Sequence, residues 1–114
     1  MHSDIVAVIN TSPDTVELLR SVLQRAGMVV VSAYTFDIRD NRVDIEALVR
    51  RHNPAVIVYD VAPPYDENWR LFEHIRDMAA FKGRRFVITS TNPKHLEQLV
   101  GRDETVYEVV GRPL

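Results

Sequence analysis

Polar side chains that could do chemistry stand directly after the apolar runs of this sequence. Asp60 is the acid among them, and it closes an apolar run, where a buried carboxylate is costly unless a partner compensates it. Such an aspartate more often serves a site than merely caps the following turn. The other groups at comparable places are Asn10, Thr11, Thr89, Ser90, Thr91 and Arg112. The chemistry expected of this set is hydrogen bonding and charge pairing around one carboxylate.

The apolar runs themselves predict the strands that must position these groups. They are rich in β-branched residues and lack polar alternation, which is typical of strands covered on both faces of a parallel sheet. The runs are Ile5–Ile9, Met28–Ser32, Val56–Asp60, Phe86–Thr89 and Val106–Val110.

Segments with helical spacing of apolar residues lie between these strands. Their apolar positions fall within residues 16–26, 45–52, 71–79 and 96–100. Ser12 and Pro13 have the residue types of a helix N-cap and first turn, and Gly27 lies where that helix should stop. We interpret the polar segment 34–44 as a long loop. The elements then alternate as (βα)4β.

This alternation predicts an α/β fold, a doubly wound three-layer sandwich with a parallel five-stranded sheet, formed by one domain over residues 1–114. Right-handed crossovers place helices on both faces and bring the carboxyl ends of the strands to one edge. The polar groups listed above should meet there.

Composition narrows the possible functions. The chain has 114 residues, a formal net charge of −2 and no cysteine. This balance argues against direct nucleic-acid binding, so we interpret the basic cluster at 82–85 as a solvated loop. The absence of cysteine and of any apolar run near the roughly 20 residues of a membrane helix predicts a cytoplasmic protein with no membrane association. No phosphate-binding glycine loop or nucleophile elbow is present, so we do not expect an enzyme.

Four motifs together resemble the receiver domains of two-component response regulators. Residues 13–33 look like the first helix and second strand of a receiver, and residues 54–77 look like the third strand, the loop and the third helix. Within FVITS, Thr89 falls at the position of the switch hydroxyl, and the final motif is Arg112 with its following proline.

The resemblance covers nearly the whole chain and implies a flavodoxin-like fold with strand order 2-1-3-4-5. It also implies that Asp60 is the phosphoacceptor, with Pro64 in the loop after it, and that a sensor kinase or another signalling protein is the partner. A homodimer through the fourth helix and fifth strand is a further expectation. Receivers continue into a fifth helix, which we expect to be missing or truncated here because the sequence ends at Leu114.

Two departures from the family pattern affect the expected chemistry. Asn10 and Thr11 stand in place of the acidic pair that holds Mg²⁺ in receivers, so the site loses most of its charge attraction for that ion. Arg112 replaces the family lysine and could grip the Asp60 carboxylate with two hydrogen bonds. We therefore expect an atypical receiver with weak or no Mg²⁺-dependent phosphorylation at Asp60, acting by protein contact and needing no cofactor or metal.

Two alternatives stay open. Asp14 and Glu67 could replace the lost metal ligands, which would make the chain a conventional phosphoacceptor. Alternatively, Asn10, Thr11 and the start of the first helix could bind a small anion in a flavodoxin-like module. The four histidines show no metal-ligand spacing, and we expect Trp69 to pack in the core and not to form a partner surface.

Overall fold

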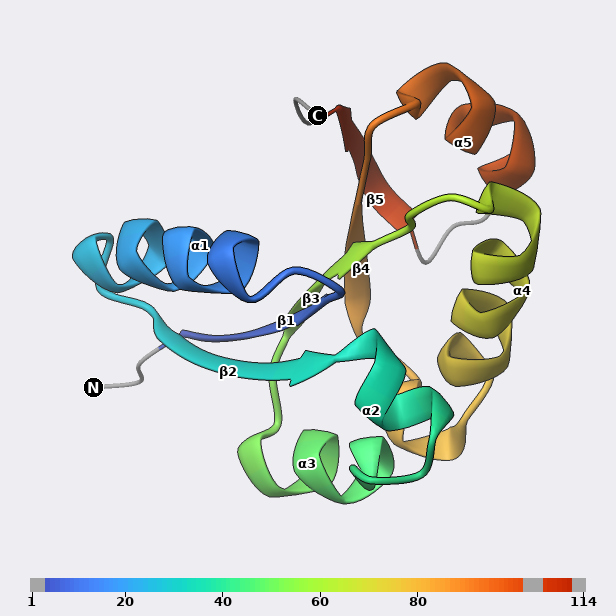
Figure 1. Cartoon of the computed structure of the whole chain (residues 1–114). Coiled ribbons are helices and arrows are strands. Elements are labelled where there is room, and N and C mark those ends of the chain that lie inside the picture. The colour runs from blue at the N-terminus through green and yellow to red at the C-terminus, as the bar shows by residue number, and fades with distance from the viewer. Residues whose placement is uncertain (1–3, 102–105, 112–114) are drawn as a thin grey trace.

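A parallel sheet with helices on both faces forms the molecule (Figure 1). The computed structural model describes residues 4–101 and 106–111. In chain order the elements are β1 (Ile5–Asn10), α1 (Pro13–Arg25), β2 (Val29–Tyr34), α2 (Thr35–Arg39), α3 (Ile45–His52), β3 (Val56–Asp60), α4 (Tyr65–Arg76), the 3-10 helix η1 (Ala79–Phe81), β4 (Arg85–Ser90), α5 (Pro93–Val100) and β5 (Val106–Gly111).

The five strands are all parallel and lie in the order β2-β1-β3-β4-β5, which confirms the predicted fold class and topology. β3 is the central strand, and its last residue, Asp60, is in register with Thr89 of β4. Asn10 ends β1, the other neighbour of β3. The parallel arrangement therefore brings the candidate residues of three strands to the same edge of the sheet.

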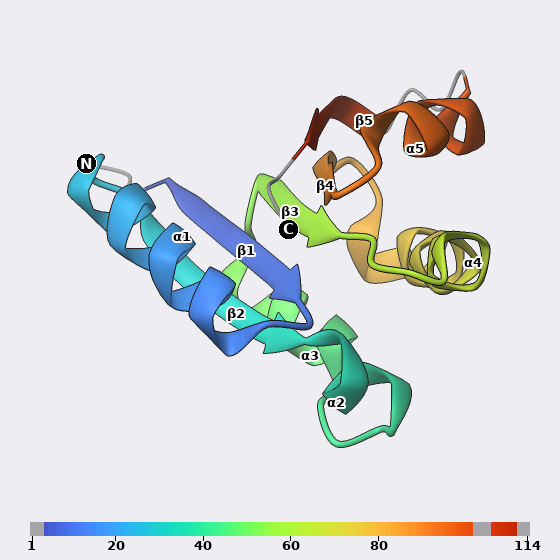
Figure 2. The same ribbon diagram turned by 45° about the horizontal axis from the view of Figure 1, so that its top comes forward.

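The two faces of the sheet bury separate apolar clusters. On one face, Val16 of α1 packs with Val8 of β1 and Val30 of β2. The other face carries the larger cluster, which is formed between the sheet and α3, α4, α5 and η1. Ile57 of β3, Phe72 of α4 and Leu96 of α5 are fully buried in it. Figure 2 shows α1 running along β1 and β2, away from β4 and β5.

The segment that we interpreted as a loop contains a helix. Tyr34 still belongs to β2, and α2 follows it directly over Thr35–Arg39. A five-residue helix is too short to be stable alone, so the cause is tertiary: Thr35 and Ile38 are both buried against the rest of the molecule. In the sequence, the helical spacing of Thr35 and Ile38 is too short to recognise among the charged residues around them.

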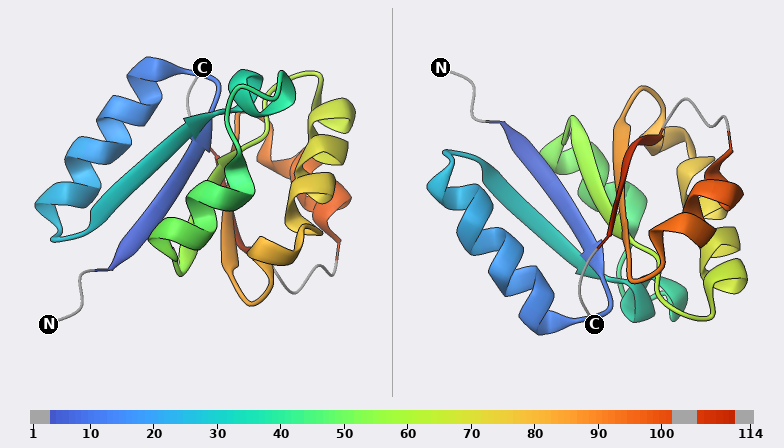
Figure 3. Two further views of the ribbon diagram at one scale, coloured as in Figure 1. Left: turned by 90° about the horizontal axis from the view of Figure 1, so that it is seen from below. Right: turned by 90° about the horizontal axis from the view of Figure 1, so that it is seen from above.

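The five α-helices include α2, so they do not include a helix after β5, which is the last described element. On the α1 side of the sheet, α1 covers β1 and β2, and no described helix overlies β3 (Figure 3, right panel). Val58 and Val87 on that side are half-buried, and Val110 is exposed. Leu18 and Val22 of α1 are also exposed. Within the described residues, no helix is long and apolar enough to cross a membrane.

Candidate functional site

Asp60 and Thr89 form the centre of the candidate site. Asp60 is only 2% exposed, and the Thr89 hydroxyl donates a hydrogen bond of 2.7 Å to its Oδ1 atom. The Val61 N–H donates to the Thr89 carbonyl over 2.9 Å, which continues the ladder between the two strands beyond Asp60. A buried carboxylate needs such donors to offset its desolvation. The structure thus brings together the two residues that the sequence predicted as phosphoacceptor and switch hydroxyl.

Asn10 is buried at the same edge of the sheet, and its side chain hydrogen-bonds to the backbone of the loop that follows β1. Its Oδ1 atom accepts a hydrogen bond of 2.9 Å from the Ser12 N–H, an Asx turn. Ser12 then caps α1, because its hydroxyl accepts from the Thr15 N–H over 3.3 Å. The predicted capping role of Ser12 is confirmed. Thr11, between them, is exposed.

The donor set at this edge does not fit a divalent cation. Mg²⁺ in proteins is held by carboxylates together with waters or phosphate oxygens. Asp60 supplies a carboxylate at this edge, and the side-chain Oδ1 of Asn10 already accepts a hydrogen bond from the Ser12 N–H. In the part of the chain that the structure describes, no group of three or more histidine, aspartate or glutamate side chains is arranged to hold a metal ion.

The loop after β4 repeats the turn chemistry of the loop after β1. Ser90 is fully buried, and its hydroxyl accepts from the Asn92 N–H over 3.1 Å. Asn92 caps α5 by accepting from the His95 N–H over 3.3 Å. Two of the polar side chains expected at the site, Asn10 and Ser90, therefore shape the loops around Asp60.

Two contacts join the first turn of α4 to α5 and to the loop that precedes α5, and the sequence interpretation missed both. The hydroxyls of Tyr65 and Thr91 lie 2.7 Å apart, and His95 Nε2 lies 3.1 Å from Asp66 Oδ1. The Tyr65 and His95 rings are also in contact, with centroids 5.6 Å apart. These residues open α4 and α5, which follow neighbouring strands, and that placement was the available sequence signal.

Asn68 makes a second link between the Asp60 loop and its surroundings. It accepts a hydrogen bond of 2.6 Å from Arg39 of α2 and donates one of 2.7 Å to the Ala62 carbonyl. The Arg39 guanidinium thereby connects α2 to the first turns of α4. Neither residue stood out in the sequence, because the role depends on the helix α2 that was interpreted as a loop.

Tyr59 places a hydroxyl in the core next to the site. The side chain is 1% exposed and packs edge-on against Phe72, with centroids 5.0 Å apart. Among the described residues its hydroxyl has no hydrogen-bond partner, and the same is true of the buried Thr35 hydroxyl. Burial raises the pKa of Tyr59 well above its ordinary value; the Arg39 charge opposes this shift and the Asp60 charge adds to it.

The remaining predicted residues have structural roles or lie elsewhere. Trp69 is 5% exposed and packs on Phe72, which confirms the core interpretation. In the basic cluster, the Arg84 guanidinium donates to the carbonyls of Ala80 and Pro54. It thereby links the segment before β4 to the segment before β3, at the opposite end of the strands from Asp60. Arg112, the expected replacement for the receiver lysine, lies outside the described residues.

Comparisons with known proteins identify the fold. No protein-family model matches the chain, and no curated protein matches it. Solved structures do match. The N-terminal domain of a response regulator receiver protein from Methanoculleus marisnigri has a TM-score of 0.72 at 15% identity, over 96% of this chain and 84% of that one. A chemotaxis response regulator from Vibrio cholerae has a TM-score of 0.68 at 19% identity, over 99% and 89%.

A third structure carries chemistry in its description. A response regulator from Burkholderia pseudomallei, with a phosphorylated aspartic acid, a calcium ion and citrate, has a TM-score of 0.70 at 14% identity, over 98% of this chain and 61% of that one. At such identities the likeness establishes a shared fold. The chain has the fold of response regulator receiver domains.

Proposed function

We propose that this chain is an atypical receiver domain, a signal-transduction module that works through protein contacts with weak or no Mg²⁺-dependent phosphorylation at Asp60. The proposal rests on the composition of the carboxyl edge of the sheet. Asp60 and Thr89, which the resemblance to receivers makes phosphoacceptor and switch hydroxyl, are in register and joined by a hydrogen bond, and this supports the proposal. At the end of β1, an amide that accepts from the backbone replaces an acid.

The missing acids matter because of the chemistry of phosphoryl transfer. The protein contributes mainly positioning, and a metal ion neutralises the charge on the transferring group. The Asp60 carboxylate and the Asn10 side-chain amide, whose oxygen already accepts from the backbone, offer such an ion little electrostatic attraction. We therefore expect Asp60 to react slowly or not at all with a phosphodonor.

A conventional phosphoacceptor is the runner-up, with Asp14 and Glu67 as replacement ligands. Both side chains are exposed, and both open helices, where an acid is stabilised by the helix dipole without any ligand role. The phosphorylated aspartate and calcium ion belong to the Burkholderia pseudomallei protein. Extending that chemistry to this chain would require acids at the end of β1, where Asn10 and Thr11 stand.

The partner of such a module is another signalling protein, with a sensor kinase as the first candidate. Association of two copies is a further proposal, which follows from the resemblance to receivers. The fourth helix of the predicted pattern is α5 in this structure, so the surface would consist of α5 and β5. Sedimentation velocity of the whole chain over a range of concentrations tests it, and a single monomeric species throughout would contradict it.

Intact mass after incubation with acetyl phosphate and Mg²⁺ tests the proposed function. We expect no phosphoryl adduct on the wild-type chain, and an adduct on a variant that carries Asn10→Asp with Thr11→Asp. Adding Asp60→Asn to that variant should remove the adduct. A wild-type adduct that Asp60→Asn abolishes would contradict the proposal and support the conventional phosphoacceptor.

A further inference from the structure

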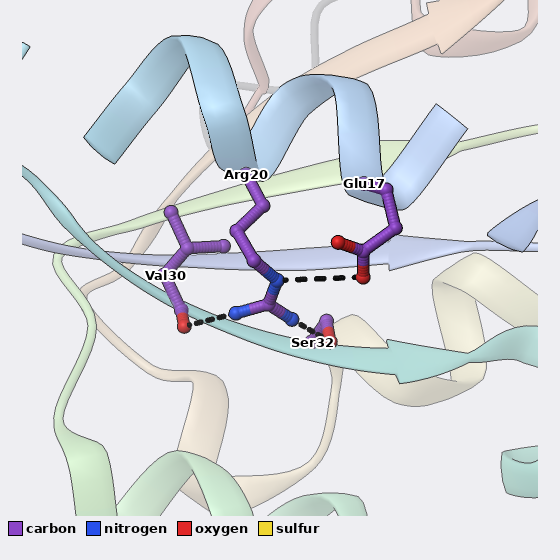
Figure 4. Close-up of polar contacts among 4 residues, drawn as sticks. All are labelled: Glu17, Arg20, Val30 and Ser32. Carbon is purple, nitrogen blue, oxygen red and sulfur yellow. Dashed lines mark hydrogen bonds and ion pairs between the residues drawn. The ribbon is translucent and has the colours of Figure 1, made fainter. Parts of the chain in front are cut away.

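One side of α1 is hydrogen-bonded to the edge of the sheet. Arg20 donates from Nη1 to the Val30 carbonyl of β2 over 3.0 Å and from Nη2 to the Ser32 hydroxyl over 2.7 Å. Glu17 lies 3.6 Å from Arg20 Nε. Figure 4 shows the Arg20 side chain extending from α1 to β2, with the guanidinium between Glu17 and the strand. These contacts fix the rotation of α1 about its own axis, and therefore which of its residues face away from the strand.

The opposite side of α1 carries two exposed apolar residues. Leu18 is 65% exposed and Val22 is 54% exposed, the two highest values among the large hydrophobic residues that the structure describes. Each is two positions from Arg20 in the sequence, which places it about 160° around the helix from that side chain. Leu18 and Val22 lie one turn apart and form one patch. The patch is small, so a partner must also contact the residues around it.

A charge of each sign flanks this apolar pair. Asp14 lies one turn before Leu18, and Arg25 lies three residues after Val22. At about 100° per residue, the four side chains fall in a sector of about 80°, and the other charged residues of α1 lie outside it. Asp14 and Arg25 are both exposed, and no ion pair joins either of them to another described residue. This face of α1 therefore has an acidic end, an apolar centre and a basic end.

We propose that this face of α1 binds the same face of α1 in a second copy of the chain, with the two helices antiparallel. Under two-fold symmetry, Leu18 of each copy meets Val22 of the other. Asp14 of one copy then lies within one residue, about 1.5 Å along the helix axis, of Arg25 of the other.

The charge pattern of the face selects a second copy as the occupant. A purely acidic or purely basic partner would be attracted by one end of the face and repelled by the other. An antiparallel copy of α1 places an opposite charge at both ends, whereas a parallel copy would place like charges together. The antiparallel arrangement also aligns the positive end of each helix dipole with the negative end of the other.

The size of the face predicts a weak dimer. α1 has 13 residues and is about 20 Å long, so two such helices should bury less surface than the roughly 1,200 Å² of a standard interface. We expect a dissociation constant on the order of 100 μM, which sedimentation velocity of the whole chain from about 10 μM to about 1 mM would measure.

Charge reversal at each end of the face tests the pairing. Asp14→Arg leaves two cations on the face and Arg25→Glu leaves two acids, so each variant alone should associate at least about tenfold more weakly than the wild type. In an equimolar mixture of the two, every cation faces an acid, and association should return to about the wild-type level. Arg51→Glu is the matched control, because Arg51 is an exposed arginine in the last turn of α3, and it should associate as the wild type does.

Leu18→Gln provides a second measurement, which is needed if a charge reversal prevents folding, as circular dichroism would show. Glutamine is a good helix former, so the helix should persist while the apolar centre is lost, and association should weaken at least about fivefold. An unchanged dissociation constant would contradict the proposal.

The outcomes separate this surface from others. Weaker association of both single variants with recovery in their mixture supports the antiparallel pairing of α1. A wild-type chain that is monomeric over the whole range, or a mixture that does not recover, would show that the proposal is wrong. If the wild type associates and no α1 variant alters that association, the contact lies elsewhere, for example on α5 and β5, and the assignment to α1 is wrong.

Discussion

The Thr89 hydroxyl donates a 2.7 Å hydrogen bond to the Asp60 carboxylate, and the two residues are in register on adjacent parallel strands. This hydrogen bond joins the central strand β3 to its neighbour β4 at the carboxyl ends of both strands. It makes the hydroxyl part of the immediate surroundings of a buried acid, so a change at either residue should be felt by the other.

Thr89→Val should destabilise the protein by about 1–3 kcal/mol, because valine has a similar shape and leaves the buried carboxylate without this donor. Urea unfolding at neutral pH measures the free energy of unfolding. Thr11→Val is the matched control at the same edge, and its effect should be small because Thr11 is exposed. Equal losses in the two variants would show that the bond between Thr89 and Asp60 adds nothing to stability.

Tyr59→Phe should leave stability at pH 7 unchanged or raise it, because the hydroxyl removed is buried and lacks a hydrogen-bond partner among the described residues. The substitution should also change the response to alkali. The raised pKa keeps the folded state protonated while the unfolded chain ionises above about pH 10. Wild-type stability contributed by Tyr59 is therefore complete below about pH 10 and falls above it, by up to about 1.4 kcal/mol per pH unit.

The difference between the wild type and Tyr59→Phe in urea unfolding, measured from pH 7 to pH 11, isolates this contribution from the other groups that titrate. The wild type should lose stability faster than the variant above pH 10. Parallel curves would mean that the Tyr59 hydroxyl is as accessible in the folded state as in the unfolded chain.

Asn68→Ala should loosen the loop after β3, because it removes the bonds to Arg39 and to the Ala62 carbonyl. We expect a loss of about 1–2 kcal/mol in unfolding free energy and faster amide hydrogen exchange at Val61, whose N–H donates to the Thr89 carbonyl, and at Ala62. Arg70→Ala is the control on the same helix, since Arg70 is exposed. Unchanged exchange in the loop would remove Asn68 from the residues that position Asp60.

Asp60 and Arg112 should be coupled if Arg112 grips the carboxylate, as its residue type suggests. A double-mutant cycle with Asp60→Asn and Arg112→Ala should then give an interaction energy of about 1–3 kcal/mol in unfolding experiments. Additive effects of the two substitutions would rule the ion pair out.

The strands could be predicted from the sequence because fully buried parallel strands are continuous apolar runs, and β3 was predicted with its observed bounds, Val56–Asp60. The candidate site followed in part, since Asp60 ends β3 and Thr89 lies next to the last residue of the neighbouring strand β4. The short helix α2 could not be predicted, because the burial of Ile38 depends on the complete fold. The pairs Tyr65 with Thr91 and Asp66 with His95 join residues 26 and 29 positions apart, and their contact depends on how two loops meet.

Those two pairs have a mechanical consequence. The Asp66 carboxylate contacts His95 in the first turn of α5, and the Tyr65 hydroxyl contacts Thr91, which follows two residues after Thr89, the partner of Asp60. If the loop that contains Thr91 moved towards or away from Asp60, the first turns of α4 and α5 would therefore move with it. Under the receiver function proposed above, we expect a partner to detect the state of Asp60 at the outer surfaces of α4 and α5, because Asp60 itself is buried.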